Sequence, residues 1–333
     1  MISDSLHIAV SSDSNYAKLV SILLVSLFEN NQWATFITVH LLSNNIDEEN
    51  IKHIKEHIPR DKGNLKIYDI SDIACRLKID VPETIAISSY SRLFLSSLLN
   101  EDIDKVIYMD VPHDLYHYQS HEVVSRIEDL GGLRDLWCLD LGDNHIAGVL
   151  DDVALYAKKA IGLKNNDAYV NAGFLLINLK QWRKEKVESK ILDYLIAHNG
   201  NVFHHDQGLI NAVCNRKMIL PVNYNMVTNF FVFPYKSFKQ KPFYSEKEMI
   251  DGKEHPIFIH FTAGVANRPW MNNCKHPLKD SFLMYKAKSL YRDVPLEKDS
   301  RPTKLKILAS LYYHCKPLYY FSLKLRSLIE NKI

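Results

Sequence analysis

The chain has 333 residues, of which 47% are hydrophobic, and a formal net charge of +2, so it can form a large buried core in one large or two modest domains. Its five cysteines are an odd number without CxxC spacing, which argues against a disulfide framework or a zinc cluster. The first residues lack an export signal, and the longest apolar run, "LVSILLVSLF", is too short to span a bilayer. We therefore expect a cytoplasmic protein.

The first two hundred residues alternate short β-like runs with helical patterns. We expect strands at 7–13, 33–42, 64–70 and 104–110, and helices at 15–30, 47–58 and 88–99. Asp47 is placed to cap the second helix. This alternation predicts an α/β fold with a mostly parallel sheet between helices, and with ligands at the carboxyl ends of the strands. Asp13 and Asp110 each lie at such an end.

The later part of the chain contains further strands and helices. We expect strands at 145–151, 169–179 and 256–263, and helices from Trp182 to about His198 and from Asp206 to Asn215. The pattern loosens from about residue 216. The simplest division is one continuous domain over 1–275, followed by a basic, aromatic-rich C-terminal region over 276–333.

Residues 301–333 carry seven lysines or arginines against one acidic residue, a net charge of +6, so the preceding 300 residues carry −4. Basic residues interleaved with "LYYHCKPLYYFSLKL" are typical of a segment that lies on an anionic membrane surface. A C-terminal helix that packs on its own domain with a solvated basic face is the alternative, and both interpretations stay open. Because the rest of the chain is acidic, the composition argues against nucleic-acid binding.

Glycine usage restricts how a nucleotide can bind. No two of the 11 glycines are separated by one residue, so the chain contains neither GxGxxG nor GxxxxGK[ST]. The phosphates of a bound nucleotide would need another source of positive charge, and a divalent cation held by carboxylates at a strand end is the usual one. Asp110 in "IYMDVPHDLYHY" fits this role, but Pro112 stands where a second acid would complete a metal-binding pair.

Several segments, taken in order, resemble the family 8 retaining glycosyltransferases, especially the bacterial galactosyl- and glucosyltransferases that extend lipooligosaccharide and lipopolysaccharide cores. Together they cover about residues 7–275. The matching segments are "IAVSSDSNY", "ISSYSRLFL", "DKVIYMD", "LWCLDLGDNHIAGVLD", "YVNAGFLLINLKQW", "HHDQGLIN", "LPVNYN" and "IHF" followed by "RPW".

The resemblance implies a GT-A fold, a UDP-glucose or UDP-galactose donor, a glycan or glycolipid acceptor, and Mn²⁺, with Mg²⁺ as the alternative. With the basic tail, it implies peripheral attachment to the inner face of the plasma membrane. The residues that it assigns to donor binding are Asp13, Asn15 and Tyr16 for the base and ribose, Arg92 beside the phosphates or sugar, and Asp110, Asn171, Gly264 and Arg268. Asp13 also fits as a helix cap, and Arg92 as a surface salt bridge.

The resemblance places Asp151, Asp206 and Gln207 at the reaction centre, and Gly173 where a side chain would crowd the donor. Asp206 also fits as a cap of the following helix. Because an amide is a poor nucleophile, we expect same-face attack, with a phosphate oxygen of UDP accepting the acceptor's proton.

The metal ligands implied by the resemblance are Asp110 and His260, and the acid missing at Pro112 leaves three interpretations. Asp114 or His113 replaces the lost ligand; or Arg92 and Arg268 neutralise the diphosphate with little or no metal; or the protein is an inactive relative that binds a sugar nucleotide or glycan, or acts as an assembly partner. His260 alone also fits as a core histidine.

Overall fold

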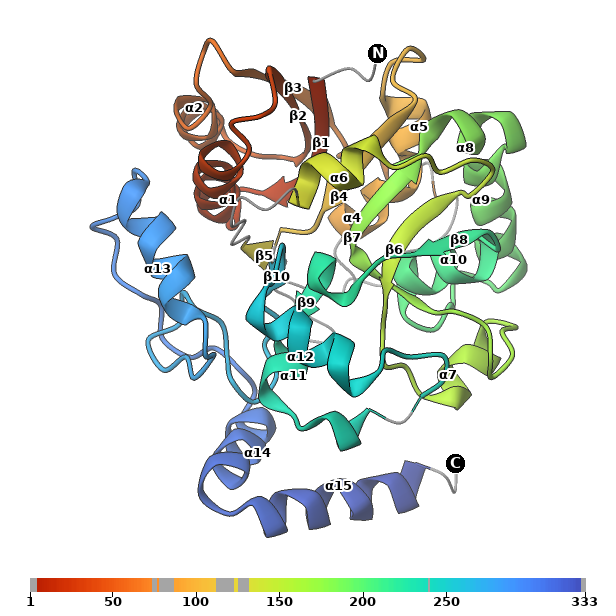
Figure 1. Ribbon diagram of the computed structural model, residues 1–333, viewed down its shortest axis with the longest axis vertical. Coiled ribbons are helices and arrows are strands. Elements are labelled where there is room, and N and C mark those ends of the chain that lie inside the picture. Colours follow the sequence, from red (N-terminus) through yellow and green to blue (C-terminus); the bar gives the residue numbers. More distant parts are fainter. Residues whose placement is uncertain are drawn as a thin grey trace.

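The computed structural model describes residues 5–73, 77, 87–111, 123–124, 132–238 and 240–330. Its centre is a seven-stranded sheet with the strand order β3-β2-β1-β4-β7-β6-β8 (Figure 1). The strands are β1 (Ser5–Asp13), β2 (Phe36–Asn44), β3 (Gly63–Asp69), β4 (Lys105–Met109), β6 (Ile146–Leu150), β7 (Val170–Asn178) and β8 (Lys217–Ile219). The neighbouring pairs that exclude β7 are parallel, which confirms the predicted α/β fold with a mostly parallel sheet.

Helices cover both faces of this sheet. The helices that precede β8 in the chain are α1 (Ala17–Asn30), α2 (Glu48–Glu56), α4 (Ile87–Tyr90), η1 (Ser91–Phe94), α5 (Leu95–Leu98), α6 (Gly132–Cys138), α7 (Leu155–Ala160), α8 (Leu179–Glu185), α9 (Val187–Ala197) and α10 (His205–Val213). The later helices are η2 (Val222–Asn225), α11 (Thr228–Val232), η3 (Tyr235–Ser237), α12 (Glu246–Glu254), α13 (Lys279–Lys288), α14 (Thr303–His314) and α15 (Lys316–Glu330).

Alternate residues of the central strands enter two separate cores. In β4, Ile107 and Met109 pack in the core that contains α1, whereas Val106 and Tyr108 pack in the core that contains Trp182 of α8. Successive side chains of a strand point to opposite faces, so a strand that is apolar at every position is buried on both. This explains why the strand segments read as continuous apolar runs.

Strand β7 runs antiparallel to both of its neighbours, β4 and β6, which the alternating sequence pattern did not reveal. The link from Leu150 to Val170 contains only the short helix α7, so β7 starts at the same side of the sheet at which β6 ends. The amino end of β7 therefore lies beside the carboxyl ends of β4 and β6.

Two sequence-based expectations differ from the structure. The strand expected at 256–263 is only Ile259–His260 (β10), in a second sheet of order β5-β10-β9 with Val123–Val124 (β5) and Met226–Val227 (β9). The helix expected from Trp182 to about His198 divides into α8 and α9, because Lys186 between them adopts a left-handed conformation with φ 53°. Asp47 caps α2 as predicted, accepting from the Asn50 amide at 2.9 Å.

The segment that follows residue 275 packs on the first helix before it reaches the C-terminal helices. Asn30 at the end of α1 donates to the Tyr285 hydroxyl at 2.8 Å, and Glu29 pairs with Lys288 at 2.5 Å. Lys18 of α1 forms an ion pair with Glu297. Figure 1 shows α14 and α15 at the end of the molecule opposite to the N-terminus. No helix among the described residues is long and apolar enough to cross a membrane.

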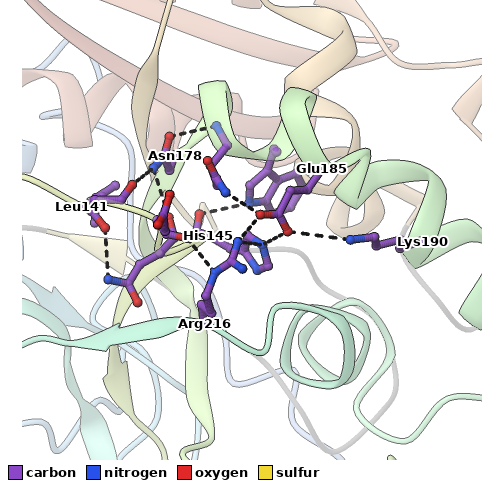
Figure 2. A network of polar contacts seen from close by, with 11 residues as sticks. Leu141, His145, Asn178, Glu185, Lys190 and Arg216 are labelled. Atoms are coloured by element: carbon purple, nitrogen blue, oxygen red, sulfur yellow. Dashed lines mark hydrogen bonds and ion pairs between the residues drawn. The ribbon is translucent and has the colours of Figure 1, made fainter.

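A polar network fixes the end of α8 at the side of the sheet where β6 and β8 begin (Figure 2). This side is opposite to the strand ends described below. The carboxylate of Glu185 accepts from His145 at 3.0 Å and from Arg216, and lies 3.7 Å from Lys190. Hydrogen bonds from Arg216 and His145 lower the pKa of Glu185 to about 2, so this carboxylate stays charged. The network joins the starts of β6 and β8 to α8, and it includes no residue of the strand ends described below.

We predict that acid destabilises the fold through buried histidines. Burial lowers the pKa of His276 to about 3, whereas an unfolded histidine has a pKa near 6.5. The unfolded chain therefore binds more protons, and stability falls as the pH drops below about 6.5, by about 1.4 kcal/mol for such a histidine at pH 5.5. Burial, followed by His7 and Lys66, likewise lowers the pKa of His40 to about 3.

Urea unfolding at pH 7.5 and 5.5 measures this loss. His276 lies between Phe231 and Phe261, so His276→Phe suits its surroundings and should reduce the loss, whereas His255→Asn at an exposed position should not. An unchanged loss in His276→Phe would contradict the prediction.

Candidate active site

Polar residues gather where β1, β4 and β6 end and β7 begins. Asp13 is the last residue of β1, and Asp110 and Asp151 directly follow β4 and β6. The backbone joins these ends to β7, because the Asp110 amide donates to Gly173 O at 2.7 Å and the Asp151 amide to Tyr169 O at 2.9 Å. The predicted position of a ligand site, at the carboxyl edge of the sheet, is therefore occupied by carboxylates and amides.

Arg92 lies at the centre of this edge and is 2% exposed. Its Nη2 donates to Asp110 Oδ1 at 2.8 Å, and its Nε lies 3.1 Å from Asp206 Oδ2. Nη1 donates to Ala172 O at 2.6 Å, and the guanidinium stacks over the Tyr108 ring at 4.4 Å. Arg92 is thus a buried cation between two carboxylates, and the surface salt bridge considered from sequence is wrong.

The carboxyl group of Asp110 is 3% exposed and shares its Oδ1 between Arg92 and the Tyr108 hydroxyl, which donates at 3.1 Å. Burial, opposed by Arg92 and reinforced by Asp206, raises the pKa of Asp110 to about 6. Its Oδ2 accepts no hydrogen bond from the part of the chain that the structure describes. A second cation near Oδ2 would therefore stabilise the ionised form.

Gln207 and Asn171 converge on Asp151. Gln207 Nε2 donates to Asp151 Oδ2 at 3.1 Å, and Asn171 Nδ2 donates to the same oxygen at 3.0 Å. The Oε1 of Gln207 accepts from the Ala172 amide at 3.0 Å, which fixes the orientation of the side chain. The three residues are therefore brought together as the sequence predicted, with Gln207 and Asn171 buried.

A further hydrogen-bond chain runs from Asn171 to His260. Asn225 Nδ2 donates to Asn171 Oδ1 at 2.9 Å, and Asn225 Oδ1 accepts from His260 Nδ1 at 3.0 Å. This partner places the proton of the imidazole on Nδ1 and its lone pair on Nε2, the form that binds a metal. Sequence reasoning assigned no role to Asn225, although it lies in the matched segment "LPVNYN".

Gly173 is required for the close approach of His260. A Cβ at Gly173 would lie 2.3 Å from His260 Cε1 and 3.1 Å from Asn171 Oδ1. Gly173 is therefore a close-approach position, but the group that a side chain would crowd is the His260 imidazole, and crowding of the donor stays a prediction. Since Asp110 binds the same glycine through its backbone amide, Gly173 brings Asp110 and His260 to one place.

Asp206 lies within the first turn of α10 and does not cap that helix, because the residue before the helix is His204, in a left-handed conformation with φ 61°. Its carboxylate is held by Arg92 instead. Gly208 in the next turn has no room for a side chain, since a Cβ there would lie 1.9 Å from Phe203 O. The cap considered from sequence is thus wrong for Asp206.

The three residues predicted to contact the base and ribose lie at the end of β1 and in the turn that leads to α1. Asp13 Oδ1 accepts from the amides of Asn15 at 2.9 Å and Tyr16 at 3.3 Å, but the N-cap of α1 is Tyr16 and no side chain caps that helix, so the helix cap considered for Asp13 is wrong. Asn15 is exposed, whereas Tyr16 is 6% exposed and packs in the core beside α1. Their contacts with a nucleotide stay predictions.

The loop that contains Gly264 and Arg268 is hydrogen-bonded to Arg301, in the segment that precedes α14. Arg301 Nη1 donates to Gly264 O at 3.0 Å and to Val265 O at 3.3 Å, and its other nitrogens bind both oxygens of Asp299 at 2.9 Å. Gly264 has φ 40°, and Arg268 is 5% exposed. Sequence reasoning missed Arg301 and Asp299, because both lie beyond the expected domain boundary.

The residues present fit a divalent ion in part. A carboxylate oxygen from Asp110 and an imidazole nitrogen from His260 are a mixed donor set that Mn²⁺ accepts. No group of three or more potential His, Cys, Asp or Glu ligands occurs within the described residues. Pro112, His113 and Asp114, on which the replacement of the missing acid depends, lie outside them.

Carboxylates, amides and a histidine thus gather at one end of a mostly parallel sheet flanked by helices, which is an α/β architecture. Residues 7–274 match the family model for Glycosyl transferase family 8. General stress protein A of Bacillus subtilis (strain 168) is 23% identical over 286 residues, covering 84% of this chain and 92% of that protein. A lipopolysaccharide 1,2-glucosyltransferase of Escherichia coli is 25% identical over 302 residues, covering 89% and 82%.

The crystal structure of the galactosyltransferase LgtC with donor and acceptor sugar analogs is similar in fold, with a TM-score of 0.69 and 22% identity over 90% of this chain and 98% of that one. This chain belongs to glycosyltransferase family 8 and has the GT-A fold. The resemblance inferred from the ordered segments is confirmed.

We predict that Arg92→Met destabilises the protein by about 3–5 kcal/mol, because it leaves Asp110 and Asp206 buried without their cation. Urea unfolding measures the loss. Arg134→Met, at an exposed position, should change stability by no more than about 0.5 kcal/mol. Adding Asp206→Asn to Arg92→Met should restore part of the loss, and a single variant as stable as the parent would refute the role of Arg92.

We predict that Asn225→Leu weakens Mn²⁺ binding by about 10–100-fold, because the His260 imidazole loses the acceptor that orients it. Stability should fall by about 1–3 kcal/mol for the polar groups left unpaired. Titration of Mn²⁺ followed by its paramagnetic resonance signal measures binding directly. Asn223→Leu, in the same turn, is the control, since Asn223 Oδ1 accepts no hydrogen bond. Equal Mn²⁺ affinity in both variants would contradict the prediction.

Proposed function

We propose that the protein is a retaining hexosyltransferase that moves glucose or galactose from a UDP-sugar to a glycan acceptor, such as lipopolysaccharide, lipooligosaccharide or another cell-surface glycan. The observation that carries the proposal is the buried array at the sheet edge, where Gln207 and Asn171 converge on Asp151 next to the Arg92 pair with Asp110 and Asp206. Carboxylates accept hydrogen bonds from sugar hydroxyls, and side-chain amides both accept from them and donate to them.

The names of the relatives support a hexose donor and a cell-surface acceptor. The Escherichia coli relative is a lipopolysaccharide glucosyltransferase, and LgtC is a galactosyltransferase. Glucose and galactose differ by one epimeric hydroxyl, which the same side-chain types can bind. The donor is therefore proposed as UDP-glucose or UDP-galactose.

The proposed nucleotide contacts follow from the strand ends. Asp13, Asn15 and Tyr16 would contact the base and ribose at the end of β1, and Arg268 with Gly264 would lie beside the diphosphate. Asp110 and His260 would hold Mn²⁺, or Mg²⁺ as the alternative, with Asp114 as the proposed third ligand. When bound, the ion would neutralise charge on the departing UDP. Arg268 would stabilise the same charge from the protein side.

The proposed chemistry is same-face attack. Gln207 is an amide whose Oε1 already accepts from the Ala172 amide, so it is suited to stabilising positive charge at the anomeric carbon rather than to forming a bond. The acceptor hydroxyl would attack from the side of the leaving UDP and give its proton to a phosphate oxygen. Asp151 would bind a sugar hydroxyl, and Asp206 would keep Arg92 in place.

The experiment is sugar transfer and UDP-sugar hydrolysis with UDP-glucose and UDP-galactose, with added Mn²⁺ and then with chelator. We expect turnover with Mn²⁺ that chelator abolishes. Turnover that survives chelator would favour neutralisation by Arg92 and Arg268. No turnover under either condition would refute the proposal and favour the alternative, an inactive family member that binds a sugar nucleotide or glycan or acts as an assembly partner.

We further predict that Pro112→Asp raises the Mn²⁺-dependent rate, because it adds a carboxylate two residues after Asp110. The measurement is the initial rate against Mn²⁺ concentration. Pro112→Asn, which adds a neutral side chain of similar size, is the control, and it should raise the rate less. A rate that Pro112→Asp leaves unchanged would mean that this position supplies no ligand.

We also propose that the C-terminal region attaches the protein peripherally to an anionic membrane surface, at the inner face of the plasma membrane. Helix α15 exposes Leu318, Phe321 and Leu323 to 53, 61 and 36%, and Ile307 of α14 is 56% exposed. Exposed apolar side chains on basic helices bind the boundary between headgroups and acyl chains. The vesicle experiment below tests this attachment.

A further inference from the structure

A groove of about 510 Å³ lies between the C-terminal helices and the main domain. One wall is formed by residues 231–234, Lys236 and Lys253 of α12, and the other by Tyr312, Lys316 and Tyr320 of α14 and α15. Figure 1 shows α14 close to α11 and α12 at this end of the molecule. None of the residues assigned to sugar transfer lines it.

Three lysines give the groove positive charge, and Glu246 is a carboxylate that acts on one of them, Lys253. Lys236, Lys253 and Lys316 line it, and none of the three forms an ion pair with a carboxylate in the part of the chain that is described. Burial lowers the pKa of Lys253, so a bound anion would favour its charged form. Lys316 lies over the Tyr312 ring at 5.3 Å. Three lysines around one groove attract a phosphate more strongly than any of them would alone.

The walls of the groove are held in place by aromatic contacts. The Tyr312 hydroxyl donates to Val232 O at 2.8 Å, and the Tyr312 side chain is almost fully buried. Phe233 meets the Tyr312 ring edge to face at a centroid distance of 5.3 Å and stacks on Tyr319 at 6.3 Å. These contacts tie the C-terminal helices to the 231–236 segment, so the groove does not need a ligand in order to form.

The position of the groove indicates what occupies it. Helix α15 contributes Lys316 and Tyr320 to the groove, and the same helix exposes Leu318 and Phe321 to solvent. At about 100° per residue, Leu318 and Phe321 lie about 100–160° around α15 from Lys316 and Tyr320, so different lipids of one membrane would contact the two sets. A membrane with anionic phospholipids supplies phosphates for the lysines and acyl chains for the apolar side chains.

We infer that the groove is a binding site for the phosphate of an anionic lipid headgroup, with Lys236, Lys253 and Lys316 as its charge partners. The inference rests on the membrane attachment proposed above and makes it more specific. Lys236 and Lys253 belong to the main domain, so a bound headgroup would fix the orientation of the catalytic domain on the membrane. Diffuse attraction of a basic tail would not do this.

The experiment measures sedimentation of the full chain with vesicles of 30% phosphatidylglycerol in phosphatidylcholine at 0.15 M salt. The test variant is Lys236→Ala with Lys253→Ala, and the control is Lys304→Ala with Lys306→Ala, which removes the same charge from exposed positions of α14 outside the groove. Diffuse attraction predicts about a fivefold loss for each lysine wherever it lies near the surface. The inference predicts a loss in the groove variant at least tenfold larger than in the control. Equal losses would overturn it.

A second arm identifies the ligand. Dioctanoyl phosphatidylglycerol below its micelle concentration should bind the parent protein and the control in calorimetry, but not the groove variant. Inorganic phosphate that binds as tightly as this lipid would overturn the lipid assignment. Parent protein that fails to sediment with vesicles would overturn both the attachment and the headgroup site, without affecting the transferase proposal.

UDP-sugar hydrolysis separates this inference from the proposed function. Both double variants should hydrolyse UDP-sugar in solution at the parent rate and should melt at the parent temperature, because no groove lysine contacts the strand-end site. Loss of hydrolysis in the groove variant alone, at an unchanged melting temperature, would place these lysines in sugar transfer and overturn the inference.

Discussion

The buried guanidinium of Arg92 is the interaction on which the candidate site depends. It holds the carboxylates of Asp110 and Asp206, which come from opposite halves of the chain, and it binds the backbone of β7 between them. Two carboxylates cannot both remain ionised in a buried place without such a cation. Because its donors are directed at protein groups, Arg92 contributes first to the position and charge of the acids and only through them to a ligand.

The remaining negative charge gives the site its chemical character. Arg92 offsets one of the two carboxylates it contacts, so the pair with Asp110 and Asp206 keeps a net charge of about −1, and Asp151 adds another carboxylate at the same edge. Such an edge repels a bare diphosphate and accepts one that arrives with a cation. The absence of a glycine-rich phosphate loop and the presence of this acidic edge therefore point to the same requirement.

The sequence was sufficient for the features that depend on local pattern. Asp13 and Asp110 were placed at strand ends because apolar runs end there, and Gln207, Asn171 and Asp151 were brought together by the family's motifs. The orientation of β7 was missed, since its apolar run reads the same in either direction. The contact of Asn225 with His260 was missed because it joins residues 35 positions apart through a buried turn, and no periodicity marks such a pair. Arg301 was missed because the change in composition suggested a boundary before it.

Arg301 has a mechanical consequence. Helix α14 begins at Thr303, two residues after the guanidinium that binds the carbonyl groups of Gly264 and Val265. Asp299 on the other side is tied through Asn273 to Asn267 of the same loop. A displacement of α14 by its surroundings would therefore pull on the loop that carries Arg268, through a lever of a few residues. The segment proposed to bind a membrane and the loop proposed to lie beside the diphosphate are thus joined by side-chain hydrogen bonds as well as by the chain itself.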